Sequence, residues 1–170
     1  MPAGDEVSGT DVCLRAVSDD DCLRLFLWRT DPETAGQSVE PAPDWTTHIE
    51  WFRARRLQRL WWMGVVRHDI AYYHATWCRT DTEWVPVGTV RLDLRDGQWH
   101  ISVAVDPWHR GHGYGRQLVE TACALAADAK IGRVTARIHS RNVASLLTFR
   151  AAGFVGVRDD GDWRIYQKGA

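Results

Sequence analysis

The segment VAVDPWHRGHGYGR, residues 103–116, joins a predicted strand to a predicted long helix through a turn rich in glycine. The glycines alternate in the turn at Gly111, Gly113 and Gly115. Glycine lets the backbone approach a ligand closely and adopt positive φ angles. A helix that begins here presents unpaired N–H groups and a partial positive charge. With Arg110 and Arg116 beside it, the turn predicts a cradle for a pyrophosphate group.

The glycine spacing excludes two other phosphate-binding motifs. A P-loop needs Gly-Lys followed by Ser or Thr, and that sequence is missing after residue 115. A dinucleotide-binding turn needs Gly-x-Gly-x-x-Gly within a βαβ unit, and the alternating glycines do not fit that spacing.

Outward from this segment, periodicity and turn signals predict a mixed α/β domain over residues 11–170, preceded by a disordered leader at residues 1–10. The segment 33–45, with its glycine and proline residues, is expected to be a loop. A capping box over residues 47–50 is expected to start the second helix. The expected strands are 11–17, 60–66, 86–94, 99–105, 133–138, 154–158 and 162–167, and the expected helices are 23–31, 47–58, 115–129 and 142–152.

Two motifs resemble the GNAT superfamily of acetyl-CoA-dependent N-acetyltransferases. The first is Arg/Gln-x-x-Gly-x-Gly/Ala, which Arg110, Gly113 and Gly115 match, and the second runs from Asn142 to Phe154. The resemblance implies a single-domain fold with a mixed, mostly antiparallel sheet, splayed at the cofactor-binding strand and flanked by about four helices. It also implies an enzyme that transfers acetyl from acetyl-CoA to a primary amine.

The same resemblance implies where acetyl-CoA binds. Backbone groups of Val103 and Val105 are expected to pair with the pantetheine arm, and the N–H of Val105 to stabilise the negative oxygen of the reacting carbonyl. The Asn142 side chain is expected to hold the pantetheine, with the helix after it lying along the cofactor. The implied cofactor-binding residues are Val103, Val105, Arg110, Gly111, His112, Gly113, Tyr114, Gly115, Arg116, Asn142, Ser145 and Phe149.

The catalytic acid and base are less well defined by the sequence. Many family members have a tyrosine acid at the position of Phe149, so this acid is missing from its usual place. The thiolate can leave unaided or through water, because a free thiol has a pKa of only about 8.5. The base candidates are His48, His100, Ser102 and Asp93, of which we favour His48 and Ser102.

The N-terminal half resembles the branch that acetylates nucleotide-linked amino sugars, typified by the pseudaminic acid pathway. The matching segments are LWRTDPE, residues 27–33, and HIEWF, residues 48–52. The implied acceptor-binding residues are Trp28, Arg29, His48, Asp93 and His100. Four of them also have a structural interpretation: Trp28 as core, Arg29 at a helix C-terminus, His48 as a solvated residue and Asp93 as a turn residue.

Other functions stay open at this stage. The amine acceptor can instead be a protein N-terminus, a polyamine or an antibiotic amine. A polyamine cleft should be strongly acidic, whereas the N-terminal half offers as many arginines as acids near the expected cleft. A non-catalytic module that only binds acyl-CoA is the alternative from another class.

Composition limits the partners. The net charge of -1 excludes a large basic field for nucleic acid. No apolar stretch approaches the ~18 residues of a membrane span, and the start of the chain lacks the apolar core of a secretory signal. The four cysteines are scattered, which predicts reduced thiols in a cytoplasmic protein and no metal site.

Residues 67–85 interrupt the family pattern. The segment is rich in aromatic residues, which is a poor composition for disorder. We expect a long hairpin that serves either as a lid over the acceptor or as the contact of a homodimer, where tryptophan and tyrosine are enriched. We favour the dimer, because a projecting hairpin with apolar faces is more easily covered by a second subunit than by a small substrate. Its aromatic and histidine residues are Tyr72, Tyr73, His74, Trp77 and Trp84.

Overall fold

The computed structural model describes residues 12–37, 41–56, 60–74 and 77–169, so the predicted leader lies outside the described residues. The described chain forms one seven-stranded sheet with the order β1-β2-β3-β4-β5-β7-β6. Its one parallel pair is β4–β5, and the other neighbours are antiparallel. The strands are β1 (Cys13–Ala16), β2 (Trp61–His74), β3 (Trp77–Arg95), β4 (Gln98–Val105), β5 (Arg133–His139), β6 (Val155–Asp160) and β7 (Trp163–Gly169).

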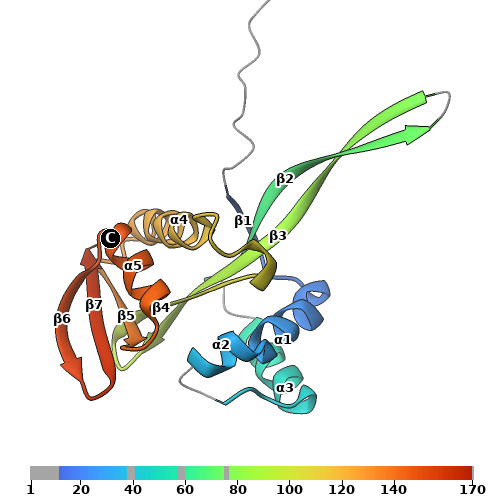
Figure 1. The fold of residues 1–170 in the computed structure, drawn as a ribbon. Coiled ribbons are helices and arrows are strands. Elements are labelled where there is room, and N and C mark those ends of the chain that lie inside the picture. Colours follow the sequence, from blue (N-terminus) through green and yellow to red (C-terminus); the bar gives the residue numbers. More distant parts are fainter. Residues whose placement is uncertain (1–11, 38–40, 57–59, 75–76, 170) are drawn as a thin grey trace, which may run out of the picture.

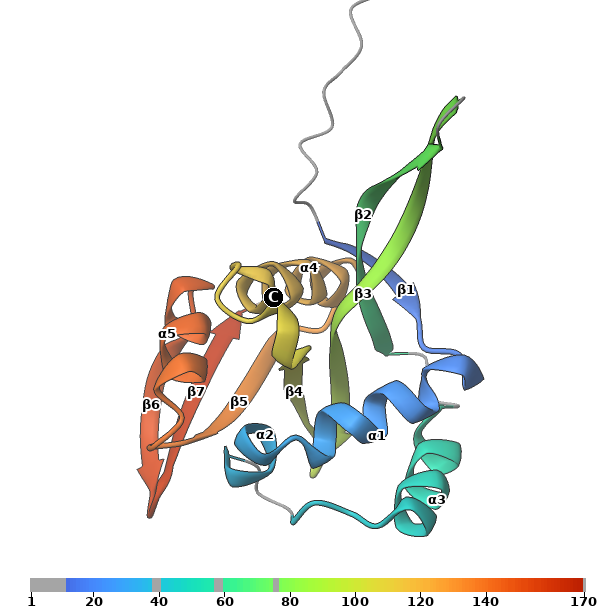
Figure 2. The ribbon, with the colours of Figure 1, turned by 45° about the vertical axis from the view of Figure 1, so that its right-hand side comes forward.

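Helices lie on both faces of the sheet (Figure 1). Helices α4 and α5 lie on one side, and the three N-terminal helices lie on the other, as the turned view also shows (Figure 2). The helices are α1 (Cys22–Thr30), α2 (Pro32–Gln37), α3 (Trp45–Arg56), α4 (Tyr114–Asp128) and α5 (Val143–Ala151). None of these helices combines the length and apolarity needed to cross a bilayer.

Two expectations about the N-terminal helices were wrong. The segment predicted as a loop contains α2, which starts with Pro32 where no N–H donor is needed. Asp31 caps this helix, because its carboxylate accepts from the Thr34 N–H at 3.0 Å. The next helix begins at Trp45 instead of within a Thr47 capping box, since Asp44 accepts from the Thr47 N–H at 2.8 Å.

The segment 67–85 forms the expected hairpin. Strands β2 and β3 stay paired out to His74 and Trp77, far beyond the point where β1 and β4 end beside them. Figure 1 shows this two-stranded arm projecting from the rest of the sheet. Whether it serves as a lid or as a dimer contact stays a prediction.

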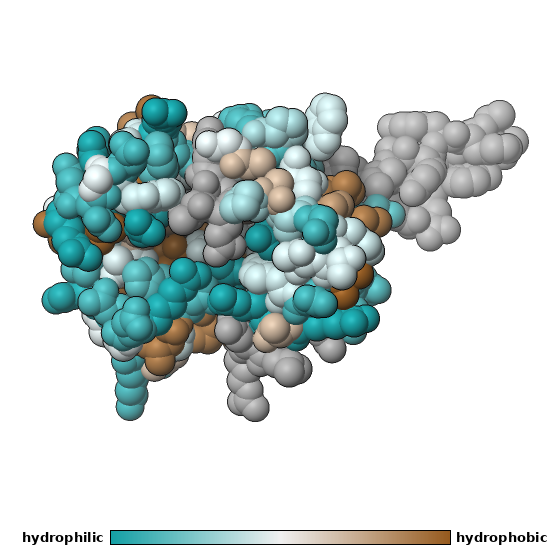
Figure 3. Space-filling model, turned by 90° about the horizontal axis from the view of Figure 1, so that it is seen from below, coloured by the Kyte–Doolittle hydropathy of each residue, from teal (hydrophilic) through white to brown (hydrophobic). Residues whose placement is uncertain are grey.

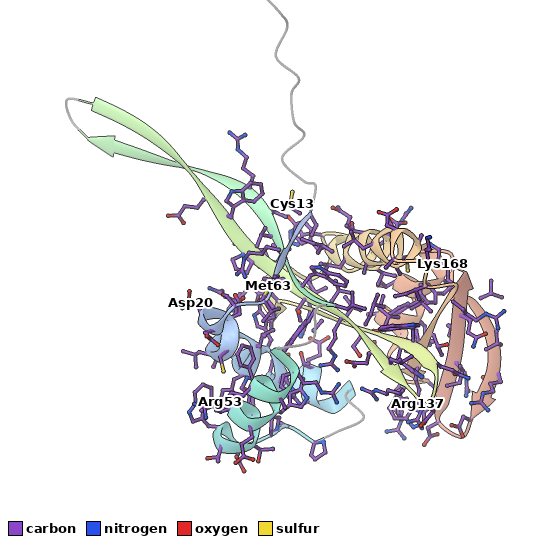
Figure 4. All side chains as sticks on the ribbon, turned by 180° about the vertical axis from the view of Figure 1, so that it is seen from behind. Cys13, Asp20, Arg53, Met63, Arg137 and Lys168 are labelled. Carbon is purple, nitrogen blue, oxygen red and sulfur yellow. The ribbon has the colours of Figure 1, made fainter. Side chains whose placement is uncertain are left out.

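Two separate cores hold the layers together. On one face, α4 packs so closely that a Cβ at Gly88 would lie 2.7 Å from Cδ1 of Leu118. The absence of a side chain at Gly88 therefore sets the height of α4 above the sheet. On the other face, α1 and α3 pack on β2 around Met63, which is fully buried and is labelled in Figure 4.

Candidate active site

The parallel strands β4 and β5 separate almost as soon as they meet. They pair only at Trp99–Val134 and His100–Thr135, so the rest of β4 lacks a strand partner on its β5 side. On its other side, the Asp106 N–H donates to the Val87 carbonyl at 2.9 Å. Since hydrogen-bonding groups alternate between the two edges of an antiparallel strand, those of Val103 and Val105 point into the gap. An extended ligand can therefore add to β4 there as a further strand.

A pocket of about 170 Å³ lies in this gap. It brings together five of the predicted site residues, namely Ser102, Val103, Asn142, Ser145 and Phe149. Three further lining residues, Arg137, His139 and Trp163, were not among the predicted site residues. Alternation along the strand after Thr135 was the signal available for Arg137 and His139, because every second residue of a strand shares a face.

The glycine turn leads from the open end of the gap into α4. Gly111 and Gly113 have φ angles of 80° and 81°, a region that disfavours side chains. Gly113 is the N-cap, and the N–H groups of Tyr114 and Gly115 in the first turn have no partner within the helix. A Cβ on Gly115 would lie 3.3 Å from the Val105 side chain, so the missing side chain lets α4 start directly against β4.

The two arginines of the turn do not point into the predicted cradle. Arg110 reaches back to α2, where it donates to Asp31 at 2.9 Å, Glu33 at 2.6 Å and Thr34 at 2.6 Å. Arg116 pairs with Glu120 one turn further along α4, at 2.7 Å. Of the predicted cradle, these contacts leave the backbone N–H groups free of the two arginines, and Arg110 instead ties the turn to the N-terminal helices.

The second motif starts α5 beside the pocket. The Asn142 side-chain oxygen accepts from the Ser145 N–H at 3.0 Å and caps the helix. Its amide nitrogen is a donor, which leaves a group suited to a ligand carbonyl. Phe149 is buried edge-on against Phe154, with ring centroids 5.0 Å apart, so it supplies packing and no proton.

A family model described as an acetyltransferase (GNAT) domain matches residues 11–155. The chain belongs to the GNAT acetyltransferase family. It is an acyltransferase that uses acetyl-CoA as its cosubstrate. The expected GNAT fold, with the sheet splayed at β4, is confirmed, with five helices in the described residues instead of about four.

Solved structures with this fold share little sequence with the chain. A domain from Methanocaldococcus jannaschii has a TM-score of 0.74 and 19% identity over 94% of this chain and 99% of that one. Spermidine N-acetyltransferase from Vibrio cholerae, in complex with CoA and spermine, has a TM-score of 0.68 and 14% identity, covering 92% and 93%. The yncA protein of Salmonella typhimurium, with acetyl-CoA, has a TM-score of 0.64 and 21% identity, covering 94% of each. No curated protein matches the chain.

In this GNAT domain, Ser102 and His100 share the face of β4 that is turned away from α4. Ile101, between them, is buried in the core under α4, so its two neighbours point to the opposite face. Ser102 is exposed and His100 is partly buried. Burial, and then the charge of Arg95, lower the pKa of His100. Its imidazole is therefore neutral at neutral pH and can accept a proton.

Asp93 does not have the setting of a base. It lies across from His100 on β3 but is only 3% exposed. Its carboxylate accepts from Arg55 at 3.0 Å, from Arg91 at 2.8 Å and from Arg95 at 3.2 Å. These three guanidinium groups occupy its oxygens, so Asp93 acts as the centre of an ion cluster.

The predicted acceptor residues of the N-terminal helices lie in the second core. Trp28 is 5% exposed and packs with Leu25, Phe52 and Trp61, so its ring is not available to stack on a substrate. Arg29 lies over the ring of Trp51, 4.0 Å from its centroid. These side chains of α1 and α3 shield the apolar side chains of β2 from water.

His48 is fully buried in α3, contrary to its reading as a solvated residue. Its Nε2 donates to the Cys22 carbonyl at 3.0 Å, so Nε2 carries the proton. Nδ1 is buried with no hydrogen-bond partner among the described residues. Rings of Phe26, Trp45 and Trp51 surround it. This position removes His48 from reach of a substrate amine.

The buried His48 gives the stability of the protein a pH dependence. Burial lowers its pKa from the ordinary 6.5, against the opposing effect of the Cys22 carbonyl. The unfolded chain then binds more protons than the native one just below pH 6.5, so the free energy of unfolding falls as the pH drops from 7 to 5. We expect His48→Phe to flatten this slope in urea unfolding. His112→Gln, at an exposed histidine, should leave it unchanged. An equal slope in both variants would contradict the assignment.

Proposed function

We propose that this GNAT enzyme N-acetylates a primary amine of an amino sugar. The observation that carries the proposal is the polar face of β4 beside the cofactor gap, where exposed Ser102 lies across from Arg91 and partly buried His100 lies across from Asp93. Serine and histidine side chains suit the hydroxyl groups of a pyranose ring. Asp93, the carboxylate described on this face, is buried and already paired with three guanidinium groups.

A polyamine acceptor fits the surroundings of Ser102 less well. Spermine, which the Vibrio cholerae neighbour binds, carries several positive charges. The side chains near Ser102 that carry charge include Arg91 and Arg137, and a cationic chain placed beside them is repelled. Seen from below, the described surface is mostly hydrophilic, with small hydrophobic patches (Figure 3).

The chain supplies binding, a hydrogen-bond donor and a base. Bound acetyl-CoA supplies the acetyl thioester, held by the backbone of Val103 and Val105 and by the N–H groups of the glycine turn. The Val105 N–H is the donor for the carbonyl oxygen that becomes negative. The amine must be neutral to react, and we propose that its proton passes through water and past Ser102 to His100, which lies further along the same face of β4. The departing thiol leaves as thiolate or takes a proton from water, because Phe149 has none to give.

A panel of acceptors tests the proposal through release of free CoA thiol. It should contain UDP- and dTDP-linked 4-amino sugars, uncharged amino sugars, spermidine, an aminoglycoside and a peptide with a free N-terminus. We expect the highest kcat/KM with an amino sugar. A higher kcat/KM with the peptide or spermidine would overturn the acceptor, and no thiol release with any amine would favour an acyl-CoA binding module.

His100→Gln tests the base. Loss of a general base costs about 10² to 10⁴ in rate, so we expect kcat to fall at least about 100-fold while the Kd of acetyl-CoA stays the same. The rise of kcat with pH that follows the titration of His100 should disappear. Arg158→Gln, on the exposed edge strand β6, is the control and should keep the kcat of the parent. A variant with kcat within a factor of two of the parent would remove His100 from the mechanism.

We further propose that the enzyme works in the cytoplasm and that the β2–β3 arm contacts a second copy of the chain. The argument for the arm is physical. A two-stranded ribbon that extends past its neighbours is marginal in water by itself, and a partner subunit would cover it. The cytoplasmic assignment rests on the four scattered cysteines, of which Cys13, Cys22 and Cys123 are free thiols in the described residues.

A further inference from the structure

Three arginines converge on one carboxylate next to the catalytic face. Arg55 comes from α3, whereas Arg91 and Arg95 come from β3, and all three donate to Asp93. Three positive charges thus face one negative charge. Asp96, exposed in the β3–β4 turn, is a second carboxylate near this cluster, and even with it the arginines stay in excess.

This excess charge is partly buried. The side chain of Arg91 is 14% exposed and lies over two rings, 5.3 Å from the centroid of Trp51 and 5.8 Å from that of Trp61. Burial lowers its pKa, which shows the cost of keeping this guanidinium charged. A partly buried surplus of positive charge costs free energy unless an anion offsets it.

The cluster also has more donors than its carboxylate can use. Each guanidinium carries five N–H donors in a planar fork, while a carboxylate offers about four acceptor sites. Asp93 therefore leaves most of the donors of Arg55, Arg91 and Arg95 to other acceptors. Guanidinium groups match phosphate and carboxylate oxygens in a bidentate geometry.

Strand register places the cluster beside the reacting groups. Arg91 lies directly across from Ser102, and Asp93 lies directly across from His100. Cross-strand partners point to the same face of a sheet. The cluster therefore borders the same surface on which the amine must approach β4, one or two residues from the assigned base.

We infer that Arg55, Arg91 and Arg95 form a subsite for an oxyanion group of the acceptor, a phosphate or a carboxylate several bonds away from the reacting amine. This inference deepens the proposed function, on which it rests for the position of the amine. Asp93 holds the three guanidinium groups in place, and the acceptor's anion completes their hydrogen bonds. The subsite selects anionic amino sugars, such as nucleotide-linked ones, over neutral and cationic amines.

Binding of UDP to protein saturated with CoA tests the subsite, since CoA keeps the glycine turn occupied. We expect calorimetry to show binding that weakens at least about 10-fold in Arg55→Gln and in Arg95→Gln, the loss of one hydrogen bond to a charged group. The matched control is Arg158→Gln, which removes the same charge from the exposed edge strand β6. Its affinity for UDP should equal that of the parent.

Glutarate in place of UDP distinguishes the two sources of the anion. Binding of either probe that weakens at least about 10-fold in Arg55→Gln and Arg95→Gln supports the subsite. The probe that binds more tightly identifies whether the subsite prefers phosphate or carboxylate. No binding of either probe to the parent, or equal binding in parent and variants, overturns it. The amine panel is read separately: UDP binding without acetylation of any amino sugar removes the proposed acceptor, whereas acetylation of neutral amino sugars without UDP binding removes the subsite.

Discussion

Gly113→Val is expected to weaken CoA binding about 100-fold. Gly113 has a φ of 81°, which a β-branched residue can hold only under strain of about 1–3 kcal/mol. Relief of that strain turns the N–H groups at the start of α4 away from the pyrophosphate. Losing two hydrogen bonds to a charged group costs about 3 kcal/mol, which is about 100-fold in Kd. Titration calorimetry with CoA measures the change directly.

Gly97→Val is the matched control for this experiment. Gly97 has a similar φ of 73°, and a Cβ there would likewise meet nothing within 4 Å. It lies in the β3–β4 turn, away from the glycine turn that begins α4. Both variants should lose stability, but only Gly113→Val should lose CoA. Equal CoA affinities in the two variants would show that the cradle has been placed wrongly.

The second large effect is expected from Asp93→Asn. The substitution leaves Arg55, Arg91 and Arg95 around a neutral amide. Removing one partner of a buried ion cluster destabilises a protein by about 3–5 kcal/mol. Chemical unfolding measures this loss. Asp160→Asn is the control: this exposed carboxylate lies 3.7 Å from Arg137, and loss of such a surface pair costs about 0–1 kcal/mol. A loss below 1 kcal/mol for Asp93→Asn would mean that the cluster does not depend on its carboxylate.

The parts of the site that the sequence predicts are those set by local backbone physics. A positive φ at Gly111 and Gly113 and a helix cap at Asn142 depend on residues within one turn. The strand before the turn and the helix after it follow from hydrophobic periodicity in the same way. For these reasons the fold class, the glycine turn and the helix cap at Asn142 can be predicted from residues 103–116 and 142–154.

The acceptor side could not be predicted in the same way, because it depends on contacts between distant segments. His48 was favoured as the base, yet packing of α3 on α1 buries it against the Cys22 carbonyl. Asp93 is a candidate base by sequence, but its carboxylate accepts a hydrogen bond from Arg55, which is 38 residues away in the chain. Arg110 illustrates the same limit, since its partners in α2 and at Asp31 just before it are 76 to 79 residues distant. Burial and charge pairing of this kind are tertiary properties.

The early parting of β4 and β5 also bears on how the protein unfolds. Hydrogen bonds join β1 to β4 as one ladder and β5, β7 and β6 as another, and only two residue pairs connect the ladders. Cooperativity between the two halves must then come mainly from the core beneath α4 and α5. Units joined this weakly can open separately, each with its own free energy. A cofactor that fills the gap supplies hydrogen bonds that β4 and β5 do not make with each other. Its binding should therefore make two loosely coupled folding units behave as one.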